Sequence, residues 1–282
     1  MANIKNFFSQ FGQTFLSLAK IALQSRPCHT PPHAGPSDEL VILGNGPSLN
    51  DIMLHHKDFL LSKHLLAVNF AACTPVFTEL KPKFYMLTDP HFFLRLEQEN
   101  VMQLWKAFAY NVDWDMTLFI PTKVNKSGEW YSLVTSKKHI SISTYNMTPV
   151  EGFSWFENFA YSHRIGMPRP RNVLIPSLMQ AISMRYNRVY LAGADHSWLK
   201  TLSVDNDNRV VSIQPHFYKE AKKEEDRIKK DYMNIPLHQV LESMYIAFRT
   251  YHTIRRYADH RGTEIINITP DSFIDAFPRL LL

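Results

Sequence analysis

The stretch Val41-Ile42-Leu43-Gly44-Asn45-Gly46-Pro47-Ser48-Leu49 decides the fold class expected of this chain. An apolar, β-type run ends in a turn with two glycines, and residues at roughly helical spacing follow. Glycines let the backbone approach an anion closely, and the free N–H groups of a first helical turn bind it. We therefore expect Gly44 to Leu49 to hold a nucleotide or sugar-nucleotide phosphate, and Gly46→Val to abolish that binding while sparing the fold. The alternative is a tight turn without a ligand.

Composition limits the class of protein. The chain has 282 residues, of which 45% are hydrophobic and 13% aromatic, enough for one large domain or a domain with a subdomain. The net charge of +5 favours anionic partners such as nucleotides, but no nucleic-acid-binding motif is present. Two cysteines, Cys28 and Cys73, are too few for a disulfide framework. We therefore expect a cytoplasmic protein that does not bind nucleic acid.

Residues 1–26 predict an amphipathic helix, because apolar residues from Phe7 to Leu23 recur at intervals of three and four. Polar residues interrupt the apolar run too often for a membrane span, which needs about 20 mostly apolar residues. We expect this helix to lie on the inner membrane surface. Packing on its own domain or on a second subunit is the alternative. Residues 27–37 are rich in proline and predict a linker, so a nucleotide-binding α/β domain is expected over residues 38–282.

Polar residues recur where predicted strands end. Three predicted strands cover residues 65–70, 83–88 and 188–193. At their carboxyl ends stand Asn69, Asp89 and the Gly193-Ala194-Asp195-His196 segment. Further strands are expected over 116–121, 139–144 and 264–268. Ligands of parallel α/β sheets bind at the carboxyl ends of strands. The pattern predicts a Rossmann-like, doubly wound, mostly parallel sheet with a site at that edge, although each polar residue alone could be an ordinary cap.

Two helices and an insertion complete the expected domain. Residues 172–184 and 237–260 have helical apolar spacing, and Gly262 is a natural stop for the second helix. Between them, residues 196–236 include a densely charged segment over 219–230. An insertion after a site-forming strand is a candidate lid. A surface excursion with no role is the alternative.

The motifs resemble a known family. The Gly44–Leu49 turn, Asn69 and the 189–195 segment look like the bacterial sialyltransferases of Campylobacter type. They also look like the wider group that joins those enzymes with motility-associated glycosyltransferases and archaeal 6-hydroxymethylpterin diphosphokinase, the MptE-like proteins. The resemblance covers about residues 38 to 275, with identity confined to short motifs. It implies a GT-A-like variant of the Rossmann-like fold.

The resemblance also implies roles for individual residues. Donor contacts would be Gly44, Asn45, Gly46, Pro47, Ser48, Asn69, Arg171, Asn172, Gly193 and Tyr218. Asp89 takes the place of a second donor-binding asparagine, which implies different contacts there. Asp195 and His196 would line the site, Tyr218 or Tyr232 in the lid would assist departure of the phosphate, and His216 or His238 would be the general base.

The chemistry of glycosyl transfer suits these residue types. A neutral imidazole can accept the proton of an acceptor hydroxyl, and tyrosine, arginine and backbone N–H groups can stabilise a leaving phosphate without a metal. We therefore expect no cofactor and no metal. Asp-x-Asp patterns occur at Asp113–Asp115 and Asp205–Asp207, but such pairs arise often by chance, and no zinc-ligand spacing is present.

The sequence therefore predicts a glycosyltransferase that moves a sugar from a nucleotide donor, CMP-linked in the sialyltransferase-like case. The expected acceptor is a glycan or lipid-linked intermediate of bacterial surface polysaccharide, and homo-oligomers are compatible with this interpretation. Two alternatives stay open. One is an MptE-like diphosphokinase that uses ATP and Mg²⁺, with Asp89 or Asp195 as metal ligand. The other is a non-catalytic nucleotide-sugar binding protein.

Overall fold

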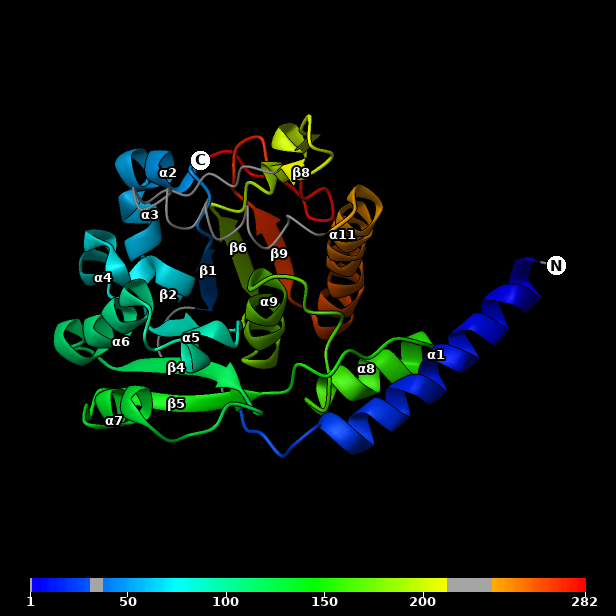
Figure 1. Cartoon of the computed structure of the whole chain (residues 1–282), viewed down its shortest axis with the longest axis horizontal. Helices are drawn as coiled ribbons and strands as arrows, with labels where there is room; N and C mark the ends of the chain where they lie inside the picture. The colour runs from blue at the N-terminus through cyan, green and yellow to red at the C-terminus, as the bar shows by residue number, and fades with distance from the viewer. Residues whose placement is uncertain (1, 31–37, 212–234) are drawn as a thin grey trace.

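The computed structural model describes residues 2–30, 38–211 and 235–282, and its centre is one sheet of seven parallel strands (Figure 1). In spatial order the strands are β5 (Ile140–Tyr145), β4 (Met116–Pro121), β3 (Phe84–Met86), β2 (His64–Val68), β1 (Glu39–Leu43), β6 (Arg188–Ala192) and β9 (Glu264–Asn267). Every pairing within this sheet is parallel. The predicted Rossmann-like α/β architecture is confirmed.

Helices cover both faces of the sheet, because successive side chains of a buried strand point to opposite faces. Val41 and Leu43 of β1 pack in one apolar cluster with the first helices after that strand, whereas Leu40 and Ile42 pack in another with the later helices. The first layer contains α2 (Leu49–His55), α3 (Lys57–Leu61), α4 (Pro75–Leu80), α5 (His91–Leu94), α6 (Glu99–Asn111) and α7 (Glu129–Thr135). The second contains α8 (Ser154–Ser162), α9 (Leu174–Ser183) and α11 (Leu237–Arg261).

The strand order contains one topological switch point. From β1 the chain adds β2 to β5 in one direction, and then places β6 and β9 on the other side of β1. Neighbouring turns after β1 and β6 therefore lead away in opposite directions and leave a crevice between them. The turn at Gly44 and the turn at Gly193 both lie at this point.

The two helices expected near the end of the chain are present. The helix predicted over 172–184 is α9, and the one over 237–260 is α11. Helix α11 ends at Gly262, whose φ of 74° lies in the left-handed region that favours glycine after a helix. The aromatic stripe of α11 is core packing, since Tyr251 and Tyr257 are both buried.

The N-terminal segment packs on the domain earlier than the predicted boundary at residue 38. After α1 (Ala2–Gln24), the backbone N–H of Arg26 donates to Oδ1 of Asn146 at 2.9 Å. The buried Thr30 hydroxyl donates to Oε1 of Gln180 at 2.8 Å. Residues 27–30 of the predicted linker are therefore fixed to the domain by hydrogen bonds, and residues 31–37 lie outside the described residues.

The predicted lid region is described only in part. It contains the 3₁₀ helix η2 (Ser197–Thr201) and a small antiparallel hairpin of β7 (Ser203–Val204) and β8 (Val210–Val211). The charged segment over 219–230 lies outside the described residues, so its role as a lid stays a prediction. Across the described ranges, none of the helices is long and apolar enough to cross a membrane.

Candidate functional site

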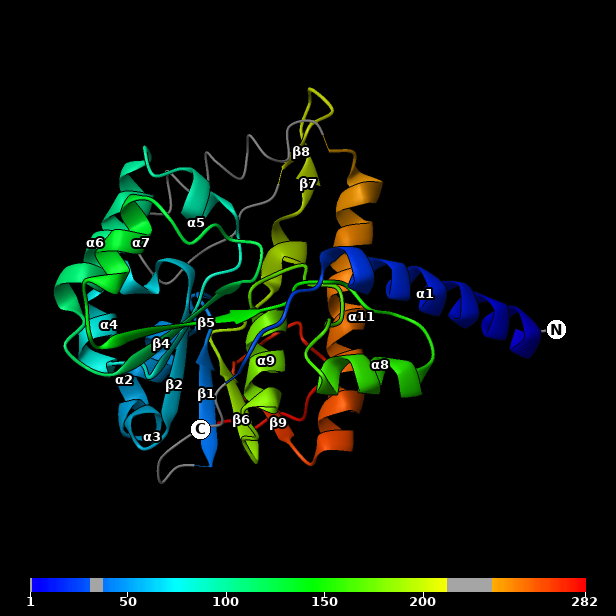
Figure 2. The ribbon, with the colours of Figure 1, turned by 90° about the horizontal axis from the view of Figure 1, so that it is seen from below.

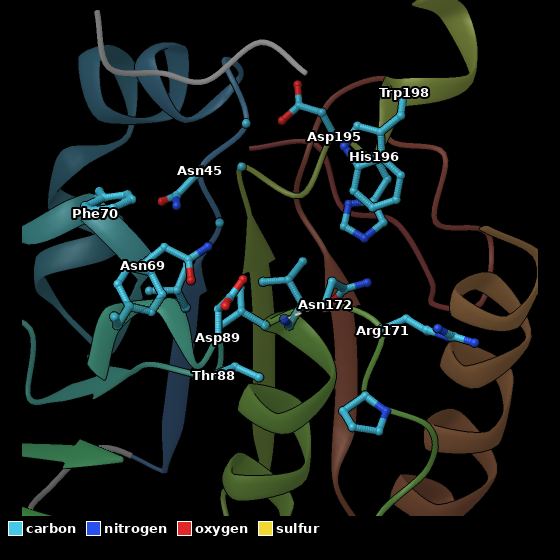
Figure 3. Close-up of a pocket in the computed structure, with 18 of the residues that line it drawn as sticks. Asn45, Asn69, Phe70, Thr88, Asp89, Arg171, Asn172, Asp195, His196 and Trp198 are labelled. Carbon is cyan, nitrogen blue, oxygen red and sulfur yellow. Dashed lines mark hydrogen bonds between the residues drawn. The ribbon is translucent and has the colours of Figure 1, made fainter. Parts of the chain in front are cut away.

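A cavity of about 420 Å³ lies at the carboxyl ends of β1, β2, β3 and β6, where the sequence predicted a site (Figure 3). Its volume is in the range of small-molecule binding sites. The lining residues that the sequence had singled out are Gly44, Asn45, Gly46, Asn69, Asp89, Arg171, Asn172, Gly193, Asp195 and His196. The fold therefore brings strand ends from distant parts of the chain together around one space.

The two glycine turns pack directly against each other. The N–H groups of Gly44 and Gly46 donate to the carbonyl oxygens of Ala192 and Gly193, at 2.7 and 2.8 Å. A Cβ on Gly44 would lie 2.3 Å from the Gly193 carbonyl oxygen, and one on Gly46 would lie 1.8 Å from Oδ2 of Asp195. Glycine is thus required by contact between the turns, and the expectation that Gly46→Val spares the fold is wrong.

The carboxylate of Asp195 occupies the anion position that the sequence assigned to a phosphate. Ser48 donates to it through its hydroxyl at 2.7 Å and through its backbone N–H at 3.3 Å. Burial raises the pKa of Asp195, and the hydrogen bonds from Ser48 oppose that rise. Neither Pro47 nor Ser48 lines the cavity. The phosphate cradle predicted at the start of α2 is therefore filled by a side chain of the protein itself.

Two asparagine side chains leave polar atoms without partners at the cavity. Both amide atoms of Asn45 and Nδ2 of Asn172 are buried and make no hydrogen bond to the described residues. Figure 3 shows Asn45 and Asn172 on opposite sides of the cavity. Buried polar groups in native proteins are nearly always paired, so unpaired amides that line a cavity indicate a polar ligand.

A chain of hydrogen bonds fixes the amide of Asn172. Its Oδ1 accepts hydrogen bonds from the N–H of Leu174 at 3.0 Å and the hydroxyl of Tyr251 at 3.1 Å. Because Tyr251 donates to Asn172, it accepts from the Nε2–H of His196 at 2.6 Å. Both acceptor sites of the amide oxygen are thus engaged, and the amide nitrogen is the atom left for the cavity.

His196 has the environment of a positioning residue. Its ring is buried beside that of Trp198, with centroids 4.1 Å apart, and burial lowers its pKa to about 3. Its backbone adopts a left-handed φ of 52°. A ring that stays neutral and hydrogen-bonded to Tyr251 holds the Asn172 amide in place rather than exchanging a proton with a substrate.

His91 is a titratable cavity residue that was not singled out from the sequence. It begins α5, directly after the strand end that supplies Asp89, and its side chain is 14% exposed. Neither ring nitrogen makes a hydrogen bond within the described ranges, and Nδ1 lies in electrostatic contact 3.4 Å from Oδ1 of Asp89. The same oxygen accepts the backbone N–H of His91 at 3.0 Å. The signal in the sequence was Asp89-Pro90-His91 immediately after a predicted strand.

Of the two histidines predicted as general bases, the structure describes only His238. His238 is exposed near the start of α11 and does not line the cavity. His216, Tyr218 and Tyr232 lie outside the described residues, so their roles stay predictions. Arg171 is exposed at the rim, makes no ion pair with the described residues, and extends toward α11 in Figure 3.

The two Asp-x-Asp patterns lie away from the cavity. Asp113 pairs with Lys81 at 2.8 Å and precedes β4, so it lies at the amino edge of the sheet. Oδ1 of Asp205 accepts the backbone N–H groups of Asp207 and Arg209 within the β7–β8 turn. Within residues 2–30, 38–211 and 235–282, no three His, Cys, Asp or Glu side chains form a group that could hold a metal ion.

Comparison with known proteins gives a similarity of fold. No protein-family model and no curated protein matches the sequence. The structure is similar to that of a MAf glycosyltransferase from Magnetospirillum magneticum AMB-1, with a TM-score of 0.51 and 12% sequence identity. The match covers 95% of this chain and 38% of that one, so the chain spans well under half of its neighbour's length. At this identity the similarity extends to the fold alone, and membership in the sialyltransferase-like group stays a prediction.

Proposed function

We propose that this chain is a glycosyltransferase that binds a nucleotide-sugar donor in the cavity between the turns after β1 and β6. The observation that carries the proposal is the set of buried polar atoms of Asn45, Asn172 and His91 that make no hydrogen bond to the described residues, around a cavity at a topological switch point. The family resemblance of the 44–49 and 189–195 segments and the name of the structural neighbour support the same class.

The cavity groups suit a donor with many hydroxyl and amide groups. Asn45 offers one acceptor and one NH₂ group, and Asn172 offers an NH₂ group whose direction is fixed by Tyr251. Sugar hydroxyls and the edge of a base form hydrogen bonds with such groups. Arg171 at the rim supplies positive charge toward the departing nucleotide phosphate.

In the transfer step, the oxygen of an acceptor hydroxyl attacks the anomeric carbon of the donor sugar. The bond from that carbon to the phosphate oxygen breaks, and its electron pair stays on the nucleotide phosphate. The hydroxyl proton passes to a general base. We assign this role to His91, because it lines the cavity and the Asp89 carboxylate, 3.4 Å from its Nδ1, stabilises the imidazolium that forms. His216 remains the alternative that the resemblance implies.

The finer assignment rests on the resemblance. It favours a CMP-linked sugar as donor and a glycan or lipid-linked acceptor in bacterial surface polysaccharide biosynthesis, on the cytoplasmic side of the inner membrane. It also favours transfer without a cofactor or metal. In the MptE-like alternative, Mg²⁺ and ATP would need Asp89 or Asp195 as a ligand, and Asp195 already accepts two hydrogen bonds from Ser48.

A thermal-shift panel of CMP, CDP, UDP, GDP and ATP, each with and without Mg²⁺, tests the proposal. We expect stabilisation by a pyrimidine nucleotide without Mg²⁺, since bound ligand raises the midpoint of unfolding. The Asn45→Ala variant should lose the shift, and the Asn111→Ala variant, changed at an exposed asparagine on α6, should keep it. Stabilisation only by ATP with Mg²⁺ would favour the diphosphokinase. Weak, equal binding of all five would favour the non-catalytic binding protein.

A further inference from the structure

Helix α1 packs on the domain through polar side chains and Ile21 and leaves most of its large apolar side chains exposed. The buried hydroxyl of Ser17 donates to the carbonyl oxygen of Glu151 at 2.8 Å, and Oγ1 of Thr14 accepts the N–H of Phe153 at 3.1 Å. The exposed large apolar residues of α1 are Ile4, Phe7, Phe8, Phe11, Phe15, Leu16, Leu18 and Leu23. Most of them repeat at three and four, so they share one face that the rest of the described chain does not cover.

The exposed face continues from α1 onto the segment before α8. The ring of Phe7 contacts those of Phe8 and Phe153, with centroids 5.9 and 5.4 Å apart, and Phe153 stacks with Trp155 at 6.5 Å. Trp155 is 68% exposed. We call this continuous surface, formed by the exposed apolar residues of α1 with Trp155, the aromatic face. Figure 1 and Figure 2 both show α1 projecting beside α8 from the body of the protein.

The charge on the α1 part of the aromatic face is positive. Residues 1–37 contain no aspartate or glutamate, whereas Lys5, Lys20 and Arg26 lie on or next to α1. None of these three makes an ion pair within the described ranges. A partner that covers this face therefore gains by carrying negative charge.

We propose that the aromatic face binds the surface of a membrane that contains anionic lipids, with α1 lying in the plane of the interface. Exposed phenylalanines with lysines beside them and no acidic residue are typical of interfacial helices. Tryptophan favours the same depth, at the boundary of acyl chains and headgroups. A second copy of the chain fits less well, because pairing two α1 helices would bring Lys5 and Lys20 of both copies together without an acidic residue on either helix.

The carboxyl end of α1 is attached to the domain at the same edge of the sheet as the cavity. The backbone of Arg26, two residues after α1, is held by Asn146, which follows the carboxyl end of β5. The next residue, Met147, lines the cavity. A membrane-bound α1 would thus hold the cavity near the lipid surface. Binding to lipid itself does not depend on the proposed function.

Co-sedimentation of the full chain with vesicles tests the proposal. Two kinds are used: phosphatidylcholine alone, and equal parts of phosphatidylcholine and phosphatidylglycerol. We expect strong binding only to the anionic vesicles, weakened by salt. The variant Phe8→Gln/Phe15→Gln changes two exposed side chains and should lower the partition coefficient by at least about tenfold. Lys5→Gln/Lys20→Gln should remove most of the preference for anionic vesicles.

Matched controls separate this result from unfolding and from the proposed function. Leu54→Gln/Leu94→Gln removes two equally exposed apolar side chains from α2 and α5 and should bind vesicles like the unmodified chain. All variants should keep the nucleotide-dependent thermal shift. Equal vesicle binding by the phenylalanine variant would overturn the proposal. So would a chain that binds no vesicles but forms a dimer that the phenylalanine variant disrupts, since the face would then bind a second copy.

Discussion

The hydroxyl of Ser48 donates a 2.7 Å hydrogen bond to Oδ2 of Asp195, and the N–H of the same serine reaches Oδ1 at 3.3 Å. These residues follow β1 and β6, the two strands on either side of the switch point. The bond therefore ties together the two turns that form the floor of the cavity. The N–H of Ser48, the residue before α2, thus faces a carboxylate of the protein, and the N–H groups of Leu49 and Asn50 donate to the carbonyl oxygens of Gly46 and Pro47.

Removing this bond should destabilise the chain in a pH-dependent manner. Burial raises the pKa of Asp195, and the hydroxyl of Ser48 lowers it. Without that hydroxyl, in Ser48→Ala, the pKa of the Asp195 carboxyl rises further. The folded chain then binds the proton more tightly than the unfolded chain, and stability falls as pH rises above about 4. We expect a loss of about 1–2 kcal/mol near neutral pH and a smaller loss near pH 4, measured by urea unfolding. A loss independent of pH would contradict this account, and Ser62→Ala, at an exposed serine, is the control.

Contact between the two glycine turns predicts that any side chain at position 44 destabilises the protein. A Cβ there would meet the carbonyl oxygen of Gly193, a backbone atom that can move only with β6. We expect Gly44→Ala to lower the free energy of unfolding by about 2 kcal/mol or more. Gly12→Ala on α1, where no atom lies within 4 Å of the new Cβ, should be neutral or slightly stabilising. Equal effects of the two substitutions in chemical denaturation would refute the packing explanation.

The amide of Asn45 makes no hydrogen bond within the described ranges, which predicts that its removal stabilises the ligand-free chain and weakens nucleotide binding. Asn45→Ala removes two buried polar atoms that have no partner within the described ranges, so we expect the ligand-free chain to gain up to about 1 kcal/mol of stability. Affinity for the stabilising nucleotide should fall at least about tenfold, measured by calorimetry. Asn146→Ala is the matched control. Its amide bonds to Arg26, Thr122 and Arg164, so its loss should cost about 2 kcal/mol or more. Destabilisation by Asn45→Ala with unchanged affinity would show that its amide does not serve a ligand.

The position of His91 predicts a split between turnover and binding. His91→Gln keeps a polar side chain at the cavity but removes a group that can accept a proton at neutral pH. We expect kcat to fall by about 10²- to 10⁴-fold with donor affinity nearly unchanged, measured by turnover and calorimetry. His238→Gln, at an exposed position outside the cavity lining, should retain full activity. Full activity of His91→Gln together with loss of turnover in His238→Gln would instead assign the general base to His238.

The buried ring of His196 predicts acid sensitivity. Its pKa is about 3 in the folded chain and about 6.5 in the unfolded chain, so the unfolded chain takes up the proton first as pH falls. The contribution of His196 to the free energy of unfolding is present above about pH 6.5 and is lost as the pH falls below that value. Between about pH 7.5 and pH 5 the loss should be about 2 kcal/mol. His196→Asn, which tolerates the left-handed backbone, should remove this part of the pH dependence of urea unfolding. Identical profiles for both chains would refute it.

The fold was largely predictable because it rests on local patterns. Each strand of the central sheet, β1 to β6 and β9, is a short apolar run bounded by polar or turn residues, and α11 shows three- and four-residue spacing along its length. The polar strand ends at Asn69, Asp89 and Asp195 converge because carboxyl ends of parallel strands share one edge. Burial of alternating side chains on both sheet faces follows from the same sequence pattern.

The sequence alone therefore determined the strands, their parallel arrangement and the edge at which the polar residues gather. Only the tertiary structure decided which polar atoms are already satisfied. Asp195 fills the cradle at Ser48, whereas the side-chain amide of Asn45 makes no hydrogen bond within the described ranges, because hydrogen-bond partners come from turns that are far apart in the chain. The same holds for α1. Its spacing predicts an apolar face, but the hydrogen bonds of Thr14 and Ser17 decide that this face points away from the domain.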